Sequence, residues 1–219
     1  MDSLRLKFTK TGRAIYISHL DLMRTMQRAF LRADMPLKYS EGFNPHAQLA
    51  FALPLSVGAS SLCELMDFRL NGFMELSEIP YRLNRTLPEG IEVLEAYEAE
   101  NKFKNIKWLD VEGVFEYDDR SPADMISTLM DFFARDSIVI QKKSKSGISD
   151  TDIASSIRSI TFDKGNGCVR LRAVISAQEP TLNPELLAAA LEQLAPEIKP
   201  DFASFTRTQV YDSEMNIFR

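Results

Sequence analysis

The chain has 219 residues, of which 45% are hydrophobic and 26% are charged. These proportions are typical of a globular protein, and they exclude a fibrous or a membrane protein. No apolar run approaches the roughly 18 to 20 residues of a membrane span, and the N-terminus lacks the apolar core of a secretory signal. Cys63 and Cys168 are too few and too far apart for a disulfide framework or a metal knuckle, which indicates a cytoplasmic protein with free thiols.

The net charge is −5, which counts against a general nucleic-acid binder, but the charge is unevenly distributed. Residues 1–60 contain eight basic and four acidic side chains, whereas residues 61–100 contain three basic and nine acidic ones. This asymmetry predicts one positive face, which matters more for an anionic ligand than the total charge does.

The first hundred residues predict the order strand, helix, strand, strand, helix, strand. Alternating residues indicate a strand over 4–18, turned at Thr11-Gly12. Ser18 is a good N-cap for a helix that Pro36 ends just after Met35. The apolar residues that recur at helical spacing predict its buried stripe: Leu22, Met26, Ala29, Phe30 and Ala33. Short extended pieces around 37–40 and 48–55, a strand over 61–70, a helix over 74–87 and a strand over 91–99 complete the order.

The order then repeats. The pattern predicts a strand over 106–118, a helix over 121–136 that Ser121 caps, and a strand over 137–143. Asn166-Gly167 indicates a hairpin within 161–176. A helix over 183–195 with Asn183 as its cap and a final strand over 202–212 close the chain, while residues 142–160 are an insertion without an assigned structure.

This arrangement predicts an α+β fold of two tandem ferredoxin-like (βαββαβ) halves with antiparallel sheets. The expected boundaries are an N-terminal domain over 1–100 and a C-terminal domain over 101–219, joined near residues 99–106.

Three arginines mark the first predicted helix. Arg24, Arg28 and Arg32 lie four residues apart, so they stay on one side of the helix, and no acid four residues away neutralises them. Such a row is either a solvated helix face or a comb of guanidinium groups for phosphate or carboxylate.

Both histidines of the chain lie near this row. His19 is in the first helical turn, where backbone N–H groups attract anions, and His46 ends the loop SEGFNPH. If the loop meets the helix N-terminus, Ser18, Asn44 and the two histidines converge with the arginines. The histidines are then candidates for acid–base catalysis, although a lone histidine is more often structural.

Other candidates are weaker. His19, Asp21, His46 and Glu64 have no metal-ligand spacing, so we expect neither a metal nor another cofactor. Phe43, between Gly42 and Asn44-Pro45, is either a core residue or an exposed stacking ring. Small and basic residues elsewhere give only weak signals for a ligand-binding loop, a mobile basic loop and a strand face: Ser56, Gly58, Ser60 and Ser61; Lys142, Lys143 and Lys145; Arg158, Arg170 and Arg172.

The segment from Tyr16 to Phe68 resembles the radical SAM-linked protein family, a bacterial family of unknown function. The family's motif positions fall on Ser18, His19, Asp21, Arg24, Tyr39, Ser40, Gly42, Phe43, Asn44, Pro45, His46, Gly58 and Glu64. The chain resembles a stand-alone member, because its two cysteines cannot hold a four-iron cluster. Relatives are often encoded near a ribonuclease of the G/E type and ribosomal protein genes, which implies a connection with RNA.

We therefore expect a non-catalytic RNA-binding module that acts with an RNA-processing or RNA-modifying enzyme. Its predicted RNA-binding residues are Ser18, His19, Arg24, Arg28, Arg32, Tyr39, Ser40, Gly42, Phe43, Asn44 and His46. The first alternative is a metal-independent ribonuclease that uses His19 and His46 as acid and base. The second is a docking partner of a separate radical SAM enzyme, with the acidic stretch from Glu89 to Glu100 as its interface.

Overall fold

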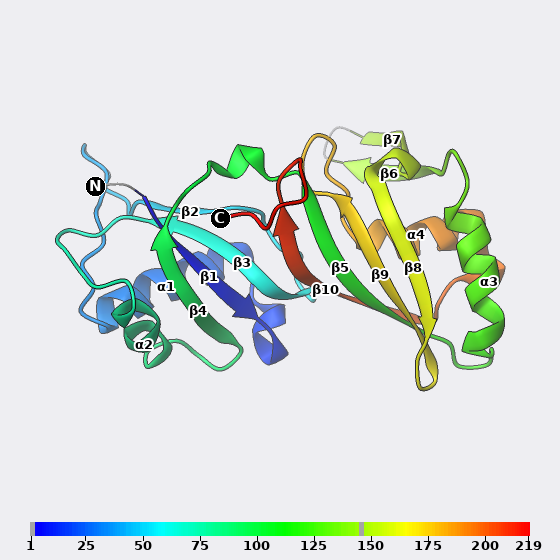
Figure 1. The fold of residues 1–219 in the computed structure, drawn as a ribbon, viewed down its shortest axis with the longest axis horizontal. Coiled ribbons are helices and arrows are strands. Elements are labelled where there is room, and N and C mark those ends of the chain that lie inside the picture. Colours follow the sequence, from blue (N-terminus) through cyan, green and yellow to red (C-terminus); the bar gives the residue numbers. More distant parts are fainter. Residues whose placement is uncertain (1–2, 145–146) are drawn as a thin grey trace. The chain divides into compact units, whose positions relative to one another are not determined.

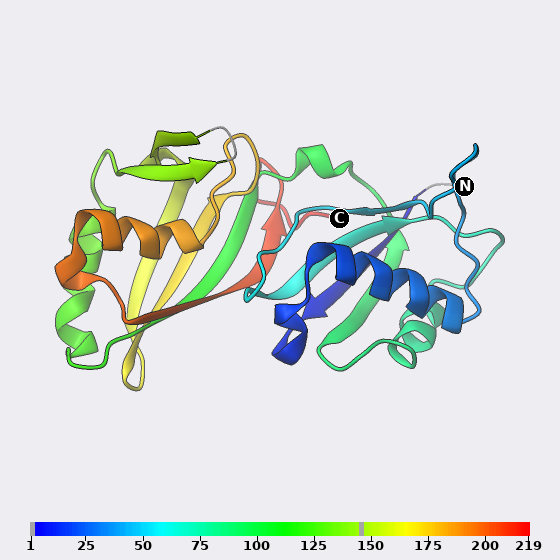
Figure 2. The same cartoon turned by 180° about the vertical axis from the view of Figure 1, so that it is seen from behind.

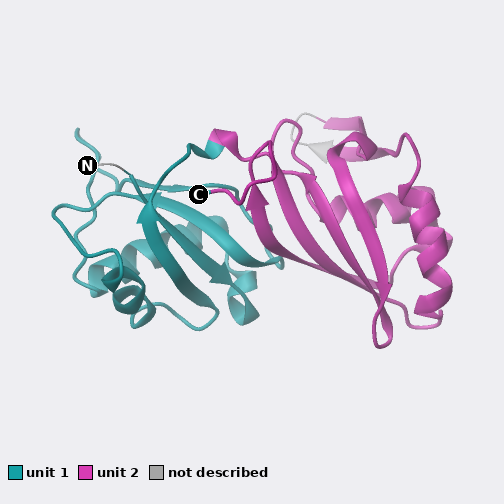
Figure 3. Cartoon of the chain, in the orientation of Figure 1, with its two compact units in different colours: residues 1–103, 219 teal, residues 104–218 magenta. Residues whose placement is uncertain are grey.

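The computed structural model describes residues 3–144 and 147–219, which form two compact units (Figures 1 and 3). Unit 1 consists of residues 1–103 with Arg219, and unit 2 of residues 104–218. Lys145, one of the expected loop cations, lies outside the described residues. No helix in the described residues is long and apolar enough to cross a membrane.

Unit 1 contains a four-stranded antiparallel sheet with two α-helices. Its strands stand in the order β4-β1-β3-β2, and β1 pairs with both β3 and β4. The elements are β1 (Leu4–Lys10), α1 (His19–Arg32), β2 (Leu49–Phe51), β3 (Ser60–Phe68), α2 (Glu78–Asn84) and β4 (Ile91–Glu98), with a 3-10 helix at Gly12–Tyr16. A further 3-10 helix, Phe103–Asn105, falls where the chain passes from unit 1 to unit 2.

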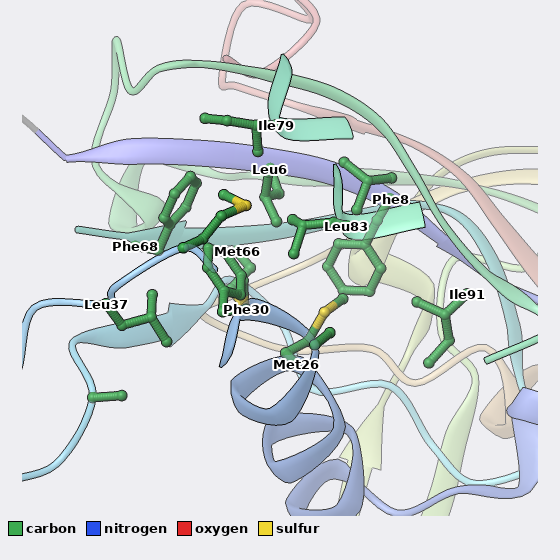
Figure 4. Packing of buried hydrophobic residues seen from close by; sticks show 14 of the residues in the cluster. Leu6, Phe8, Met26, Phe30, Leu37, Met66, Phe68, Ile79, Leu83 and Ile91 are labelled. Carbon is green, nitrogen blue, oxygen red and sulfur yellow. The ribbon is translucent and has the colours of Figure 1, made fainter. Parts of the chain in front are cut away.

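Both helices of unit 1 pack on the same face of the sheet, because their apolar residues join one core with those of the strands (Figure 4). Met26 and Phe30 of α1 meet Phe8 and Phe68 of the sheet in this core, and Leu83 contributes from α2. The helical stripe predicted for 22–33 is buried at Leu22, Met26, Ala29 and Phe30. Burying such side chains stabilises a domain by about 1.5–3 kcal/mol each.

Unit 2 repeats this order of elements and adds a hairpin. Its sheet has the order β10-β5-β9-β8, and β6 and β7 form a separate two-stranded sheet. The elements are β5 (Trp108–Glu116), α3 (Pro122–Phe133), β6 (Val139–Ser144), β7 (Gly147–Asp152), β8 (Ile157–Lys164), β9 (Cys168–Ser176), α4 (Glu185–Leu194) and β10 (Phe202–Tyr211), with 3-10 helices at Ala154–Ser156 and Pro196–Ile198.

Several predicted boundaries are wrong. The first strand ends at Lys10, and residues 12–16 form a 3-10 helix in place of the expected extended chain. Helix α1 ends at Arg32, four residues before Pro36, because Asp34 takes a left-handed conformation with φ 52°. The second helix is shorter than expected and starts only at Glu78. The unassigned insertion supplies β7 and the start of β8.

Candidate functional site

Helix α1 begins with a closed network of polar side chains. Ser18 accepts a hydrogen bond from the Asp21 N–H at 3.2 Å and donates its hydroxyl to the Asp21 carboxylate at 2.7 Å. Arg24 donates to the same carboxylate at 3.2 Å. The Ser18 hydroxyl and then Arg24 hold the pKa of Asp21 below its ordinary value. The charge of Arg24 is therefore compensated locally, which corrects the expectation of an un-neutralised row: the acid stands three residues before it.

The other two arginines of the row line an open hollow at the far end of α1. We call it the arginine hollow; its volume is about 660 Å³. The Arg32 guanidinium donates to the Thr86 carbonyl oxygen at 2.6 Å, and Arg85 lies over the Tyr81 ring at 5.5 Å and donates to its hydroxyl. The hollow is lined by Thr25, Arg28, Arg32, Arg85, Thr86, Leu87 and Pro88. None of these lining residues is acidic, and Arg28, Arg32 and Arg85 are all exposed to solvent.

Arg85 and Thr86 were not among the candidates identified from the sequence. They lie in the segment RLNRTL, which was predicted only as the end of a helix. A basic residue just after the last helical turn, beside a Pro-Glu-Gly turn, is an ordinary helix-end signal. Only the packing of α2 beside α1 brings Arg85 to the same hollow as Arg28 and Arg32.

The SEGFNPH loop is the tip of an irregular hairpin over residues 38–48. Ser40 closes its neck, because its hydroxyl contacts His46 Nδ1 at 2.8 Å and accepts the His46 N–H at 3.1 Å. Tyr39 pairs with Ala47, and Gly42 has φ 121°. Phe43 is fully exposed at 107%, so it is an exposed ring and not a core residue. Ser40 and His46 thus shape the loop, and Phe43 is the side chain it presents.

His19 and His46 do not converge. His19 stands at the N-terminal end of α1, where its ring meets Phe51 edge to face at 5.2 Å. The hairpin lies beyond the other end of this helix (Figure 2), and a helix of this length spans about 20 Å. An acid and a base must both reach one phosphate. The sequence left open whether His19, Asn44 and His46 meet; the two ends of α1 keep them apart, so the two histidines do not form an acid–base pair in this structure.

A buried polar cluster lies where β1 and β3 approach the start of α1. Lys10 is only 1% exposed and donates to the Ile15 carbonyl oxygen at 3.0 Å, and Gly58 N–H donates to the same oxygen. Burial lowers the pKa of Lys10, and the nearby Glu64, itself 3% exposed, opposes this shift. Within the described part of the chain, no three His, Cys, Asp or Glu side chains gather as metal ligands.

The strand-face arginines of unit 2 have partners within that unit. Arg172 donates to both carboxylate oxygens of the buried Asp110, one of them at 3.1 Å, and this ion pair raises the pKa of Arg172 above its ordinary value. Arg158 lies over the Trp108 ring at 5.3 Å. Arg170 is exposed beside Asp163, and both line a mixed-charge hollow. This face is therefore not uniformly positive.

The chain belongs to a family described as uncharacterized proteins conserved in bacteria (DUF2344), whose family model matches residues 3–184. That family carries no assigned reaction. No curated protein matches the chain.

Among solved structures, the chain is similar to a chain in a crystal structure of a Cbf5-Nop10-Gar1 complex. The TM-score is 0.57 at 9% identity, and the match covers 94% of this chain and 48% of that one, so the present chain spans about half of its neighbour's length. A second likeness, to an unknown protein from Galdieria sulphuraria, covers 94% and 98% of the two chains at 9% identity, but its TM-score of 0.28 carries no structural argument. At this identity the first likeness concerns the fold alone, which is a mixed α+β fold with antiparallel sheets.

Proposed function

We propose that this protein is a non-catalytic RNA-binding module that acts with an RNA-processing or RNA-modifying enzyme. We also propose that each unit is a ferredoxin-like half, a reading supported by the order β4-β1-β3-β2 in unit 1 and β10-β5-β9-β8 in unit 2. The partner enzyme in this proposal is a separate radical SAM enzyme or a ribonuclease.

The arginine hollow is the observation that carries the RNA-binding proposal. Guanidinium groups bind phosphate oxygens in a bidentate fashion, and they do so best when their charge is not already compensated. The hydrogen-bond partners of Arg32 and Arg85 are a carbonyl oxygen and a tyrosine hydroxyl, so neither partner compensates the guanidinium charge. The alternative is a structural role without a ligand, in which these arginines compensate the negative C-terminal ends of α1 and α2, since both helices end at the hollow.

Exposed aromatic rings on the hairpin beyond α1 add the second feature of a surface that binds single-stranded RNA. Phe43 is fully exposed and Tyr39 is half exposed. Base–aromatic stacking contributes about 1–3 kcal/mol per base and tolerates any sequence. Cations for the phosphates and rings for the bases favour single-stranded RNA over a duplex, whose bases are already stacked.

The separation of His19 from His46 is the reason for ranking binding above catalysis. The ribonuclease alternative required both imidazoles at one phosphodiester, and they stand toward opposite ends of α1. The docking alternative does not depend on this geometry.

The test is binding of fluorescently labelled single-stranded RNA of about 20 nucleotides, a length that covers at least one binding site of this kind, measured by anisotropy over a salt series. We expect the logarithm of the affinity to fall linearly with the logarithm of salt concentration. The double variant Arg28→Glu/Arg85→Glu is expected to bind at least about tenfold more weakly, with a smaller salt slope.

Arg135→Glu is the matched control for Arg85→Glu. Arg135 is an exposed arginine of unit 2 that also lies over an aromatic ring, Phe132, at 4.6 Å. Arg85→Glu, measured alone beside the double variant, and Arg135→Glu change the net charge equally, so weaker binding is expected of the first and near-wild-type binding of the second. Equal loss in both variants would reduce the effect to net charge, and absence of wild-type binding at low salt would refute the proposal.

A further inference from the structure

Strand β4 is an edge of the unit 1 sheet, and part of this edge is open for pairing. The Ala99 N–H donates to the Ser3 carbonyl at 2.9 Å, so alternate residues before Ala99 point their backbone groups either toward β1 or away from it. By this alternation the backbone N–H and C=O of Tyr97 and Glu95 point toward β1, whereas those of Ala96 and Glu98 point outward.

The earlier part of the same edge is covered by a side chain of α2. A register shift between Val93 and Glu95 reverses the alternation, so the backbone N–H and C=O of Val93 also point away from β1. The Asn84 amide fills this position: its Nδ2 donates to the Val93 carbonyl at 2.9 Å and its Oδ1 accepts the Val93 N–H at 2.8 Å. An amide side chain thus imitates a neighbouring strand at Val93, while Ala96 and Glu98 have no such cover among the described residues.

A pocket of about 290 Å³ lies beside the open part of the edge. Five apolar side chains line it, together with Gly72 and three charged residues. The apolar lining is Leu4, Leu70, Phe73, Met74 and Leu76, and the charged lining is Arg69, Glu75 and Glu98. Phe73 is 80% exposed at its mouth. Glu98 belongs to both the pocket and the open edge, so a strand added to β4 would pass the mouth of the pocket.

The register of such a strand decides which side chain enters. In an antiparallel pair, directly opposite residues project from the same face of the sheet. The residue that pairs with Glu98 therefore projects beside the Glu98 side chain, on the face where Leu4 packs against the core. An apolar side chain at this position fills the pocket, and its neighbours on either side project to the opposite face.

The charges around the edge select a basic partner. Residues 89–100 contain five glutamates and no lysine or arginine. Arg219 pairs with Glu95 at 3.6 Å and with Glu100 at 3.5 Å. Glu92 and Glu98 are exposed, and Glu75 adds a further carboxylate at the pocket, against the single cation Arg69. Lysines or arginines around one apolar residue complement this arrangement.

We propose that the open edge of β4 and the adjoining pocket bind an extended basic segment of a protein partner, which adds a strand to the sheet and places one apolar side chain in the pocket. Backbone hydrogen bonds to Ala96 and Glu98 supply pairing, and the pocket and carboxylates supply specificity. This site is distinct from the arginine hollow and does not rest on RNA binding.

The first test uses synthetic peptides with the intact protein. A fluorescein-labelled, end-capped peptide Lys-Val-Lys-Leu-Lys-Val-Lys is titrated at low and moderate salt, beside the same peptide with Leu→Ser, with every Lys→Glu, or with the central leucine N-methylated to block pairing. We expect the parent peptide to bind and each altered peptide to bind at least about tenfold more weakly.

Variants of the protein locate the site. Glu98→Lys removes an attractive charge at the pocket, Ala96→Pro removes an outward N–H, and Met74→Trp fills the pocket. Each is expected to weaken parent-peptide binding by about tenfold or more. Glu92→Lys is the control, because it makes the same charge change at the part of the edge that Asn84 covers; it is expected to weaken binding by less than about threefold. Circular dichroism verifies folding, and Glu98→Lys, a surface change, carries the comparison if a pocket variant unfolds.

Two results would overturn the proposal. One is equal binding of all peptides or of none, which would leave the acidic edge as a protection against strand-to-strand aggregation. The other is a wild-type protein that binds single-stranded RNA but no peptide, and that loses this RNA binding in Met74→Trp. This result would assign the pocket to a nucleobase. Peptide binding that survives in Arg28→Glu/Arg85→Glu would separate this site from the proposed RNA surface.

Discussion

The three arginines of α1 share a sequence spacing but differ in what their side chains contact. Arg24 is compensated by Asp21, Arg32 is held by the Thr86 carbonyl, and Arg28 faces the arginine hollow. A spacing of four residues predicts a common helix side, and this holds. It does not predict whether a capping acid also serves as an ion-pair partner. Asp21 does both, since its carboxylate contacts Ser18 and Arg24 at once.

Asp21→Asn is expected to act in opposite directions on stability and on RNA binding. The pKa of Asp21 is lowered, so its contribution to stability is present above the ordinary carboxyl pKa and is lost as the pH falls through the lowered value. The variant should melt at a lower temperature than wild type at pH 7, and the difference should shrink toward pH 3. RNA affinity in low salt should rise severalfold, because Arg24 loses its local carboxylate. Unchanged RNA affinity would place Arg24 outside the binding surface.

The elements themselves follow from local patterns, whereas their ends do not. Ser18 was predicted as the N-cap of α1 and accepts the Asp21 N–H, and Asn166-Gly167 turns the hairpin between β8 and β9. The C-terminal end of α1 was predicted from Pro36, but the chain leaves the helix at Ala33. The left-handed Asp34 turns the chain earlier than proline requires, and this turn allows two tertiary contacts: the pairing of Leu37 with Leu70 and the hydrogen bond from the Lys38 N–H to the Arg69 carbonyl.

The joint between α2 and β4 gives a second prediction. Asn84→Ala removes both hydrogen bonds to Val93 and is expected to destabilise the protein by about 1–3 kcal/mol, measured by urea denaturation. Asn84→Asp keeps an acceptor for the Val93 N–H but no donor for its carbonyl, so it should fall between wild type and the alanine variant. An alanine variant as stable as wild type would mean that water replaces the amide at this edge.

At the scale of the whole molecule, the two units repeat one order of elements but bury different polar groups. In unit 1, Arg5 is fully buried, donates to Asp67 at 2.6 and 3.0 Å and to the Asn101 carbonyl at 2.7 Å, and lies over Phe103. In unit 2, the buried Tyr117 donates its hydroxyl to the Ile198 carbonyl at 3.0 Å. The Arg5 contact fixes the segment after β4, and the Tyr117 contact fixes the segment after α4.

One buried tyrosine in each unit predicts how the whole chain responds to alkaline pH. Burial raises the pKa of Tyr97 and of Tyr117 to about 12. Their contribution to stability is therefore present below the ordinary tyrosine pKa of 10 and is lost as the pH rises through about 12. In a titration of phenolate absorbance, two of the six tyrosines should ionise late. Tyr97→Phe and Tyr117→Phe should each remove one late step, and early ionisation of all six would contradict the burial.

The sequence by itself determined the order of strands and helices in unit 1, the Ser18 cap, the Asn166-Gly167 hairpin turn and the buried stripe of α1, because these depend on neighbours within a few residues. In unit 2 it left β7 unassigned and placed the cap of α4 at Asn183, whereas the N-cap is Pro184. It also gave the position of the arginines and of the loop SEGFNPH. Only the tertiary structure decided that His19 and His46 stand apart, that Phe43 is exposed, and that Arg85 joins Arg28 and Arg32 around one hollow. These facts depend on which helix end each loop leaves from and on how α2 packs beside α1, and no local spacing encodes either relation.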